Sequence, residues 1–218
     1  MNIFRHVFLI SMALIYSCYA TANDPKILEV RTGDIILLPL DCFSCRMIAD
    51  EEETKFSHSG VALVDAAGKI SVVEALGKVR AVTLEEFLQR TAKSQHAILL
   101  RSHELDQLYT LDFVAFKEFQ SAANILFTKA FAGLPFDHDY LWDNYTPAGL
   151  QKLYCSEFVA KFLNHFLRVK ITPTAMDFSR NWDFWMRYFN GNVPQGKLGN
   201  SPGSFKDSKL FYQVRIFQ

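Results

Sequence analysis

The sequence lacks an excess of charge of either sign. Its 218 residues hold 23 lysines and arginines against 23 aspartates and glutamates, and they contain no long basic run. Proteins that bind nucleic acids usually cluster positive charge on one face. The composition therefore gives no electrostatic basis for a nucleic-acid partner.

Beyond its first 22 residues the chain also lacks any apolar segment long enough to cross a membrane. It shows no internal repeat and no linker that would divide it. A chain of this length can bury a sizeable core as one domain, and its 20 phenylalanines indicate a core or groove rich in rings. We expect a single domain over residues 23–218 and no stable membrane span.

The first 22 residues are typical of a signal peptide. A short basic start precedes the apolar stretch Val7–Tyr16, which is too short to span a bilayer, and the small residues "ATA" end at Ala22. We predict cleavage after Ala22 and an exported, periplasmic protein. The alternative is a lipoprotein anchored at Cys18.

Cysteine is scarce, with four residues in all. Cys42 and Cys45, in "DCFSCR", can pair in an oxidising compartment, which leaves Cys155 as a candidate reactive thiol. A redox pair is an alternative, although the usual Trp-Cys-Gly-Pro-Cys pattern is absent. A zinc site formed by these three cysteines and His58 is another. We favour a structural or incidental role for the pair.

Alternation and turn residues predict an antiparallel sheet. The apolar run after Gly33 is a buried strand, and the turn "AAGK" joins two strands as a hairpin. Strands are expected at residues 33–40, 58–65, 69–76, 78–82, 96–102 and 211–217.

Helical spacing appears in three places. Thr83 and Glu86 form a capping box for a short helix, and apolar residues of 106–131 are spaced for one broad helical face. A further helix begins near Cys155. Residues 134–149 and the Gly- and Asn-rich tail before residue 211 are expected to be loops. The class is α+β, with an antiparallel sheet or small barrel packed against helices.

Cys155 lies in "LYCSEFV", at the start of the last predicted helix. The unpaired N–H groups and the positive dipole end of a helix N-terminus favour thiolate over thiol. The apolar face begins only at Phe158, after two polar residues. The alternative is a small buried residue in the core.

A thiolate nucleophile needs a base, and the base needs an orienting group. His58 begins a strand and is followed by two small residues that allow close approach. Counting from the hairpin turn places Glu74 near His58 or Ser59 on the neighbouring strand. Pairing with Glu74 would fix the tautomer of His58 and leave its other nitrogen for Cys155. The alternative is a solvent-facing Glu74 on an edge strand.

The motifs "TGDIILLP", "FSHSGVAL", "VVEAL", "LPFD" and "YCSEFV", in this order, resemble the YaeF/YiiX-like permuted papain-fold cysteine amidohydrolases of the NlpC-type superfamily. In papain the cysteine precedes the histidine, whereas here the histidine element comes first. The resemblance runs from about residue 32 to residue 166, and the order of the motifs is its most specific part. It implies a permuted papain-like catalytic domain.

Carried over position by position, the resemblance implies that Cys155 is the nucleophile, His58 the general base and Glu74 the orienting group. Tyr154 would line the site or donate to the oxyanion, with packing as its alternative role. The backbone N–H of Cys155 is the better oxyanion donor. The implied reaction passes through an acyl-enzyme and needs no metal or cofactor.

Three functions follow as alternatives. The first is an exported amidase or peptidase acting on a small peptide or amide, with the cell wall as one source. The second is a lipid-directed acyl hydrolase or acyltransferase acting at a membrane surface. An aromatic groove would favour lipid, and an acidic one amines or peptides. The third is a non-catalytic redox or zinc-binding protein that uses Cys42 and Cys45.

Two acidic motifs give weaker signals. "DEEE", Asp50–Glu53, is expected to be a solvated loop, and beside the groove it would favour amines. "FDHD", Phe136–Asp139, offers two carboxylates and an imidazole, but a turn capped by Asp side chains is a simpler interpretation than a metal site.

Overall fold

The computed structural model describes residues 30–217, and every named helix and strand lies in the unit that begins at Thr32. The predicted cleavage site after Ala22 and the alternative lipid anchor at Cys18 lie outside these residues. Within residues 30–217, no helix combines the length and the apolar character needed to cross a bilayer.

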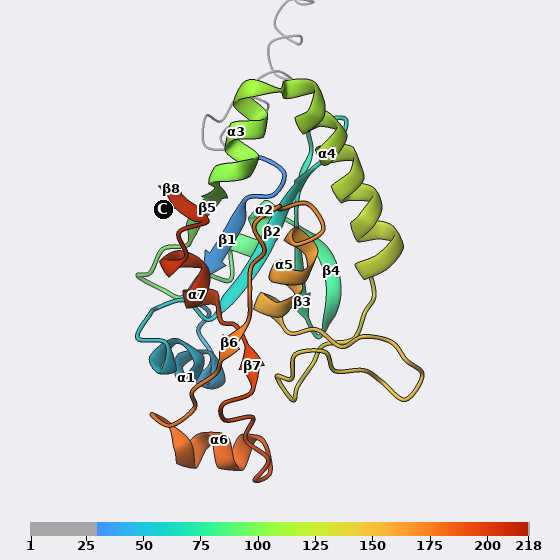
Figure 1. Cartoon of the computed structure of the whole chain (residues 1–218). Helices are drawn as coiled ribbons and strands as arrows, with labels where there is room; N and C mark the ends of the chain where they lie inside the picture. The colour runs from blue at the N-terminus through green and yellow to red at the C-terminus, as the bar shows by residue number, and fades with distance from the viewer. Residues whose placement is uncertain (1–29, 218) are drawn as a thin grey trace, which may run out of the picture. The chain divides into compact units, whose positions relative to one another are not determined.

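Six strands form one antiparallel sheet in the order β4-β3-β2-β1-β5-β8 (Figure 1). Each strand overlaps a segment that the alternation pattern predicted, and Gly68, at a positive φ of 82°, closes the β2–β3 hairpin. The strands are β1 (Ile35–Leu38), β2 (His58–Val64), β3 (Ile70–Leu76), β4 (Lys78–Thr83), β5 (Ile98–Ser102) and β8 (Phe211–Ile216).

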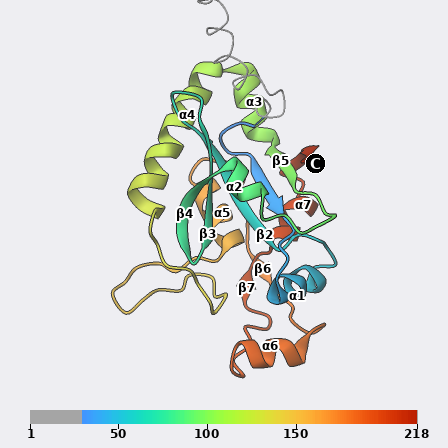
Figure 2. The ribbon, with the colours of Figure 1, turned by 180° about the vertical axis from the view of Figure 1, so that it is seen from behind.

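Both faces of the sheet are covered, because apolar residues of β1 point alternately to each side. Ile35 and Leu37 belong to the larger core with helix α5 (Cys155–Leu163), while Ile36 and Leu38 pack with Phe87 of helix α2 (Leu84–Leu88). Figure 1 shows α5 in front of the sheet, and Figure 2, from behind, shows α2 on the opposite face.

The helical prediction for residues 106–131 is confirmed, but the segment is not one helix with a single broad face. The segment forms α3 (His103–Leu111), α4 (Phe113–Leu126) and a π-helical turn, η1 (Phe127–Phe131). Asp112 ends α3 and its carboxylate caps α4 by accepting the Ala115 N–H at 3.0 Å. Leu111 and Phe113, at this corner, are therefore 74% and 50% exposed and do not share the buried face.

The expected "DEEE" loop is also wrong in its first half. Asp50 and Glu51 end helix α1 (Phe43–Glu51), and Glu51 accepts N–H groups from Asn181 at 2.6 Å and from the Trp185 indole at 2.7 Å. These bonds fasten α1 to helix α6 (Trp182–Tyr188), which the sequence interpretation missed.

The C-terminal tail is more ordered than expected. It contains a short strand and a helix that begins with a Ser-capped Pro-Gly sequence. The strand pairs with residues just before α6. The elements are β6 (Thr174–Ala175), β7 (Leu198–Gly199) and α7 (Pro202–Asp207).

Residues 134–149 form the expected loop, which contains no helix or strand. The fully buried Asp137 organises it by accepting N–H groups from Asp139 and Leu141 and the side-chain amide of Asn144. The prediction of Asp caps in "FDHD" is therefore confirmed for this residue.

Candidate active site

Cys155 is the first residue of α5 and a free, partly exposed thiol. The first turn of the helix is capped by Glu157, whose carboxylate accepts the Tyr154 N–H at 3.4 Å. Glu157 also forms an ion pair with Lys161 at 2.8 Å. The backbone N–H groups of Ser59 and Ser156 hydrogen-bond to the Cys155 sulfur. These contacts fix the thiol at the helix N-terminus.

His58 is the first residue of β2 and is almost fully buried. Its Nε2 lies 2.6 Å from Oε2 of Glu74, and its ring stacks on Phe87 with a centroid distance of 5.7 Å. The imidazole also hydrogen-bonds to the thiol of Cys155. Because a carboxylate can only accept, Nε2 carries a hydrogen and Nδ1 is the nitrogen that faces the sulfur.

Glu74 does not face solvent on an edge strand, since its side chain is 0% exposed on β3 and β4 forms the edge. The β2–β3 register pairs Val61 with Val73, so Glu74 lies opposite Gly60 and is a diagonal neighbour of His58 on one face. The sequence count that placed Glu74 near His58 or Ser59 is thus confirmed, with Gly60 as the residue directly opposite.

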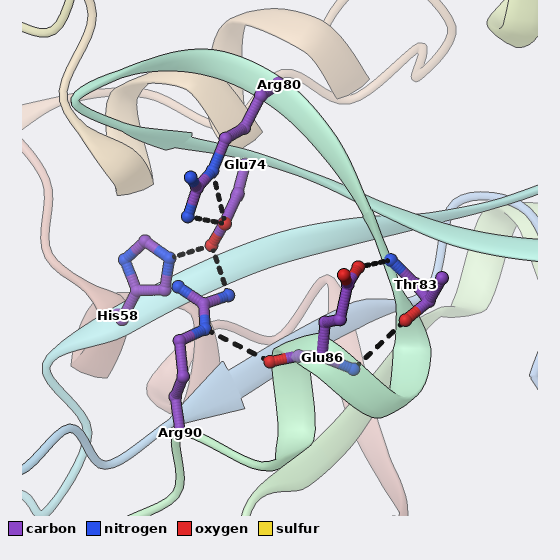
Figure 3. A network of polar contacts seen from close by, with 6 residues as sticks. All are labelled: His58, Glu74, Arg80, Thr83, Glu86 and Arg90. Atoms are coloured by element: carbon purple, nitrogen blue, oxygen red, sulfur yellow. Dashed lines mark hydrogen bonds and ion pairs between the residues drawn. The ribbon is translucent and has the colours of Figure 1, made fainter.

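Two arginines also bind Glu74 (Figure 3). Arg80, its direct partner across β3 and β4, donates from Nε to Oε1 at 3.1 Å. Arg90, two residues after α2, donates from Nη2 to Oε2 at 2.8 Å. Sequence reasoning missed both. Counting out from the turn at Gly77 would have identified Arg80, but no sequence signal places Arg90.

These contacts set the charges of the site. Burial acts to raise the pKa of Glu74, but His58 and then Arg90 lower it to about 2. Burial acts to lower the pKa of His58, but its bonds to Cys155 and Glu74 raise it to about 9. Burial acts to raise the pKa of Cys155, and the bond and charge of His58 outweigh it and lower that pKa. Both shifts favour a thiolate beside an imidazolium over a neutral thiol and imidazole.

Cys155 opens into a pocket with about 530 Å³ of empty space, open solvent included. The pocket has an aromatic wall and an acidic side, and none of the described residues that line it is a lysine or arginine. The aromatic side chains are Tyr140, Tyr154, Phe178 and Trp185, and the acidic ones are Glu51, Glu52 and Asp177.

Tyr154 both lines this pocket and packs in the interior. Its ring meets Tyr140 edge to face at 5.4 Å, and its hydroxyl oxygen accepts the Asn200 N–H at 3.1 Å. Burial and the charge of Glu157 raise the pKa of Tyr154 well above its usual range, so the hydroxyl keeps its proton. A protonated hydroxyl on the wall of this pocket can donate a hydrogen bond. Tyr140 also lines the site, and sequence reasoning did not single it out.

Cys42 and Cys45 form a disulfide, and Cys42 is the N-cap of α1. The zinc site considered from Cys42, Cys45, His58 and Cys155 does not fit this arrangement, because two of its sulfurs are bonded to each other and the other two groups form the thiol–imidazole pair. Over residues 30–217, no group of three or more His, Cys, Asp or Glu side chains is placed to hold a metal ion.

A family model described as the permuted papain-like amidase enzymes, YaeF/YiiX, C92 family, matches residues 29–181. The chain belongs to this family. The crystal structure of YiiX from Escherichia coli O157:H7, described as a metalloprotein, matches with a TM-score of 0.71 and 20% identity, over 86% of this chain and 97% of that one. At this identity YiiX supports the fold alone. No curated protein matches the chain.

The expected permuted papain-like fold, with its antiparallel sheet and helices, is therefore confirmed. The matched part of this C92 family member contains Cys155, His58 and Glu74. Trp185 and Asn200, on the pocket wall, lie beyond it. Part of the pocket beside Cys155 thus comes from a segment of the chain outside the family match.

Proposed function

We propose that this member of the amidase family is a cysteine amidase or peptidase in which Cys155 is the nucleophile, His58 transfers protons and Glu74 orients His58. The observation that carries the proposal is the continuous hydrogen-bonded series from the pocket-lining thiol through the imidazole to a buried carboxylate. A nucleophile, a base and an orienting group are the three parts that thiol acyl transfer requires.

In the first half-reaction, the Cys155 thiolate attacks the carbonyl carbon of a bound amide. The backbone N–H of Cys155, in the first turn of α5, has no partner within the helix and is suited to stabilise the oxyanion. His58 then gives its proton from Nδ1 to the leaving nitrogen as the C–N bond breaks. An amine leaves, and a thioester remains on Cys155.

In the second half-reaction, water gives a proton to Nδ1 of His58 as its oxygen attacks the thioester carbon. The C–S bond breaks, a carboxylic acid is released, and the thiolate–imidazolium pair is restored. An alcohol or amine in place of water would make the same chemistry an acyl transfer.

The pocket wall defines the candidate substrates. The acidic side chains of Glu52 and Asp177 favour an amide or small peptide that carries an amino group over an acidic substrate. A peptide fragment of the cell wall has this character. The aromatic wall, with Phe178 and Trp185, favours the second candidate function, a lipid-directed acyl hydrolase or acyltransferase.

Two further observations support export to the periplasm and an enzymatic function. The Cys42–Cys45 disulfide is typical of proteins in oxidising compartments, which agrees with export to the periplasm. Membership of an amidase family favours an enzyme over a non-catalytic redox protein. We propose that the pair stabilises the start of α1, where it caps the helix.

A thiol-directed probe tests the catalytic pair. We expect iodoacetamide at pH 7 to alkylate Cys155 in the native protein, identified by peptide mass spectrometry. The His58→Ala variant should react about tenfold more slowly, because the thiolate loses its cationic partner. His96→Ala is the matched control, since His96 is exposed and lies outside the pocket lining. Equal rates in the wild type and His58→Ala would refute the pair.

A further inference from the structure

The orienting carboxylate of this site has an unusual number of cationic partners. Glu74 is held by His58 and by both Arg80 and Arg90, and its side chain is fully buried (Figure 3). Orientation of an imidazole requires only one carboxylate oxygen. The two arginines therefore need an explanation beyond orientation.

Arg90 competes directly with the imidazole. Nε2 of His58 and Nη2 of Arg90 lie 2.6 Å and 2.8 Å from the same oxygen, Oε2 of Glu74. Two positive charges that share one oxygen lie within about 6 Å of each other and repel strongly in a partly buried site. Arg80 binds the other oxygen and is 40% exposed, against 26% for Arg90. Arg90 is thus the more strongly coupled of the two.

Holding the Arg90 guanidinium in this position costs free energy. Its Nη1 is buried and has no hydrogen-bond partner, which proteins usually avoid. The guanidinium also lies over the Phe87 ring at 5.0 Å, and its Nε donates to the backbone oxygen of Glu86. These contacts fix the charge beside the shared oxygen.

We propose that Arg90, assisted by Arg80, is a positioning residue that weakens the hold of Glu74 on the His58 proton and so lets His58 act as a base in the second half-reaction. This inference rests on the proposed thiol mechanism. It concerns the control of the site rather than its identity.

Acylation of Cys155 changes the charges that act on His58. In the free enzyme, both the Cys155 thiolate and Glu74 favour the protonated imidazole. In the thioester the sulfur is neutral and His58 has given its Nδ1 proton to the leaving amine, so only Glu74 still favours uptake of a new proton from solvent. A Glu74 without arginine partners would favour this reprotonation, and a protonated His58 cannot accept a proton from water. When Arg90 and Arg80 share the carboxylate, it favours the protonated imidazole less, and His58 stays free to act as a base.

The remaining groups around His58 do not supply this effect. On the α5 side, Tyr154 keeps its proton and is uncharged, and the buried Glu157 carboxylate is paired with Lys161 of its own helix. On the α2 side, Phe87 carries no charge, and Glu86 is an exposed carboxylate whose side chain accepts the Thr83 N–H. The charges that act on His58 after acylation are therefore those of Glu74, Arg90 and Arg80, with Glu86 as a distant exposed contribution.

Nuclear magnetic resonance titration of His58 tests the proposal directly. In a Cys155→Ala background the thiolate is absent, as in the acyl-enzyme, and the His58 ring signal is identified by its loss in His58→Gln. Adding Arg90→Gln should raise the His58 pKa by about one unit. Arg90→Lys, which keeps the charge, should shift it less. Arg168→Gln is the control, because Arg168 is 89% exposed and its ion-pair partner is Glu104, so it takes no part in the Glu74 network.

An unchanged or lowered His58 pKa in folded Arg90→Gln would overturn the proposal. If Arg90→Gln does not fold, Arg80→Gln is the deciding variant. It removes a more exposed charge from the other oxygen of Glu74 and should raise the His58 pKa by a smaller amount. No rise there would likewise overturn it. The titration uses no substrate, so its outcome is independent of the amidase proposal, which the iodoacetamide experiment tests separately.

A kinetic experiment links the titration to turnover. With p-nitrophenyl acetate as the probe, Arg90→Gln should release nitrophenol in a burst and then accumulate the acetylated enzyme, detected by intact mass. Raising the pH should restore deacylation, because His58 then loses its proton. A uniform loss of both steps with no dependence on pH would indicate a structural role only.

Discussion

The Glu74→Gln substitution should change how folding stability depends on pH. Glu74 is fully buried, and its partners lower its pKa from 4.5 to about 2. A lowered pKa in the folded state means that the carboxylate contributes stability above pH 4.5 and loses that contribution as the pH falls through 2. At about 1.4 kcal/mol per unit, the shift corresponds to about 3 kcal/mol. Glutamine keeps the shape but cannot titrate.

Urea unfolding measured between pH 7 and pH 2 provides the assay. The free energy of unfolding of the wild type should fall by about 3 kcal/mol more over this range than that of Glu74→Gln. At pH 7 the variant should already be destabilised, because His58, Arg80 and Arg90 lose their common anion. Glu118→Gln is the matched control, because Glu118 is exposed. Its curve should run parallel to that of the wild type.

The result that would refute this reasoning is a Glu74→Gln curve parallel to the wild-type curve from pH 7 to pH 2. Glu74 would then have the same pKa in the folded and unfolded chain, and the three hydrogen-bonded cations would not stabilise its charge. His58 gives an independent check at the other end of the range. Its pKa is raised from 6.5 to about 9, so the stability that it contributes is present below pH 6.5 and lost as the pH rises through 9.

Two further predictions concern the helix N-terminus and export. Burial raises the pKa of Glu157 to about 7, so the wild type should lose up to about 3 kcal/mol of stability between pH 4.5 and pH 8 that Glu157→Gln, which keeps the cap acceptor, does not lose. Equal urea-unfolding slopes against pH would contradict this. Protein isolated from the periplasm of an expressing Gram-negative host should have the intact mass of a chain starting at Asn23, whereas a lipid-modified mass starting at Cys18 would establish the anchored alternative.

The strands were predictable because their signals are local. The hairpin of β2 and β3 follows from period-two alternation around a glycine turn, and it alone brings His58 and Glu74 to one face. The thiol at Cys155 was recognisable from its place at a helix start. Its contact with His58 was expected from the order of the family motifs and from no local pattern, because it depends on how α5 packs against the sheet.

The errors have a common physical cause. Apolar spacing continues through Asp112, so periodicity alone joined two helices that the Asp112 side chain separates by capping the second. Glu51, in an acidic run, was expected to be solvated, but its carboxylate binds Trp185 from a helix more than a hundred residues later. Arg90 is similar, because its role appears only once α2 covers the sheet. Side chains whose partners are distant in sequence carry no local signal.

Glu74 contributes both to the stability of the fold and to the proposed reactivity of the site. Its partners come from β2, from β4 and from the segment after α2, so one buried carboxylate connects the edge of the sheet to the helix that covers it. A group that holds the structure together cannot be replaced without a structural effect, and a loss of activity alone would be ambiguous. The imidazole titration resolves this, because an electrostatic role predicts a shift in the His58 pKa that a merely structural role does not. The direction of that shift in Arg90→Gln is therefore the decisive quantity for the site.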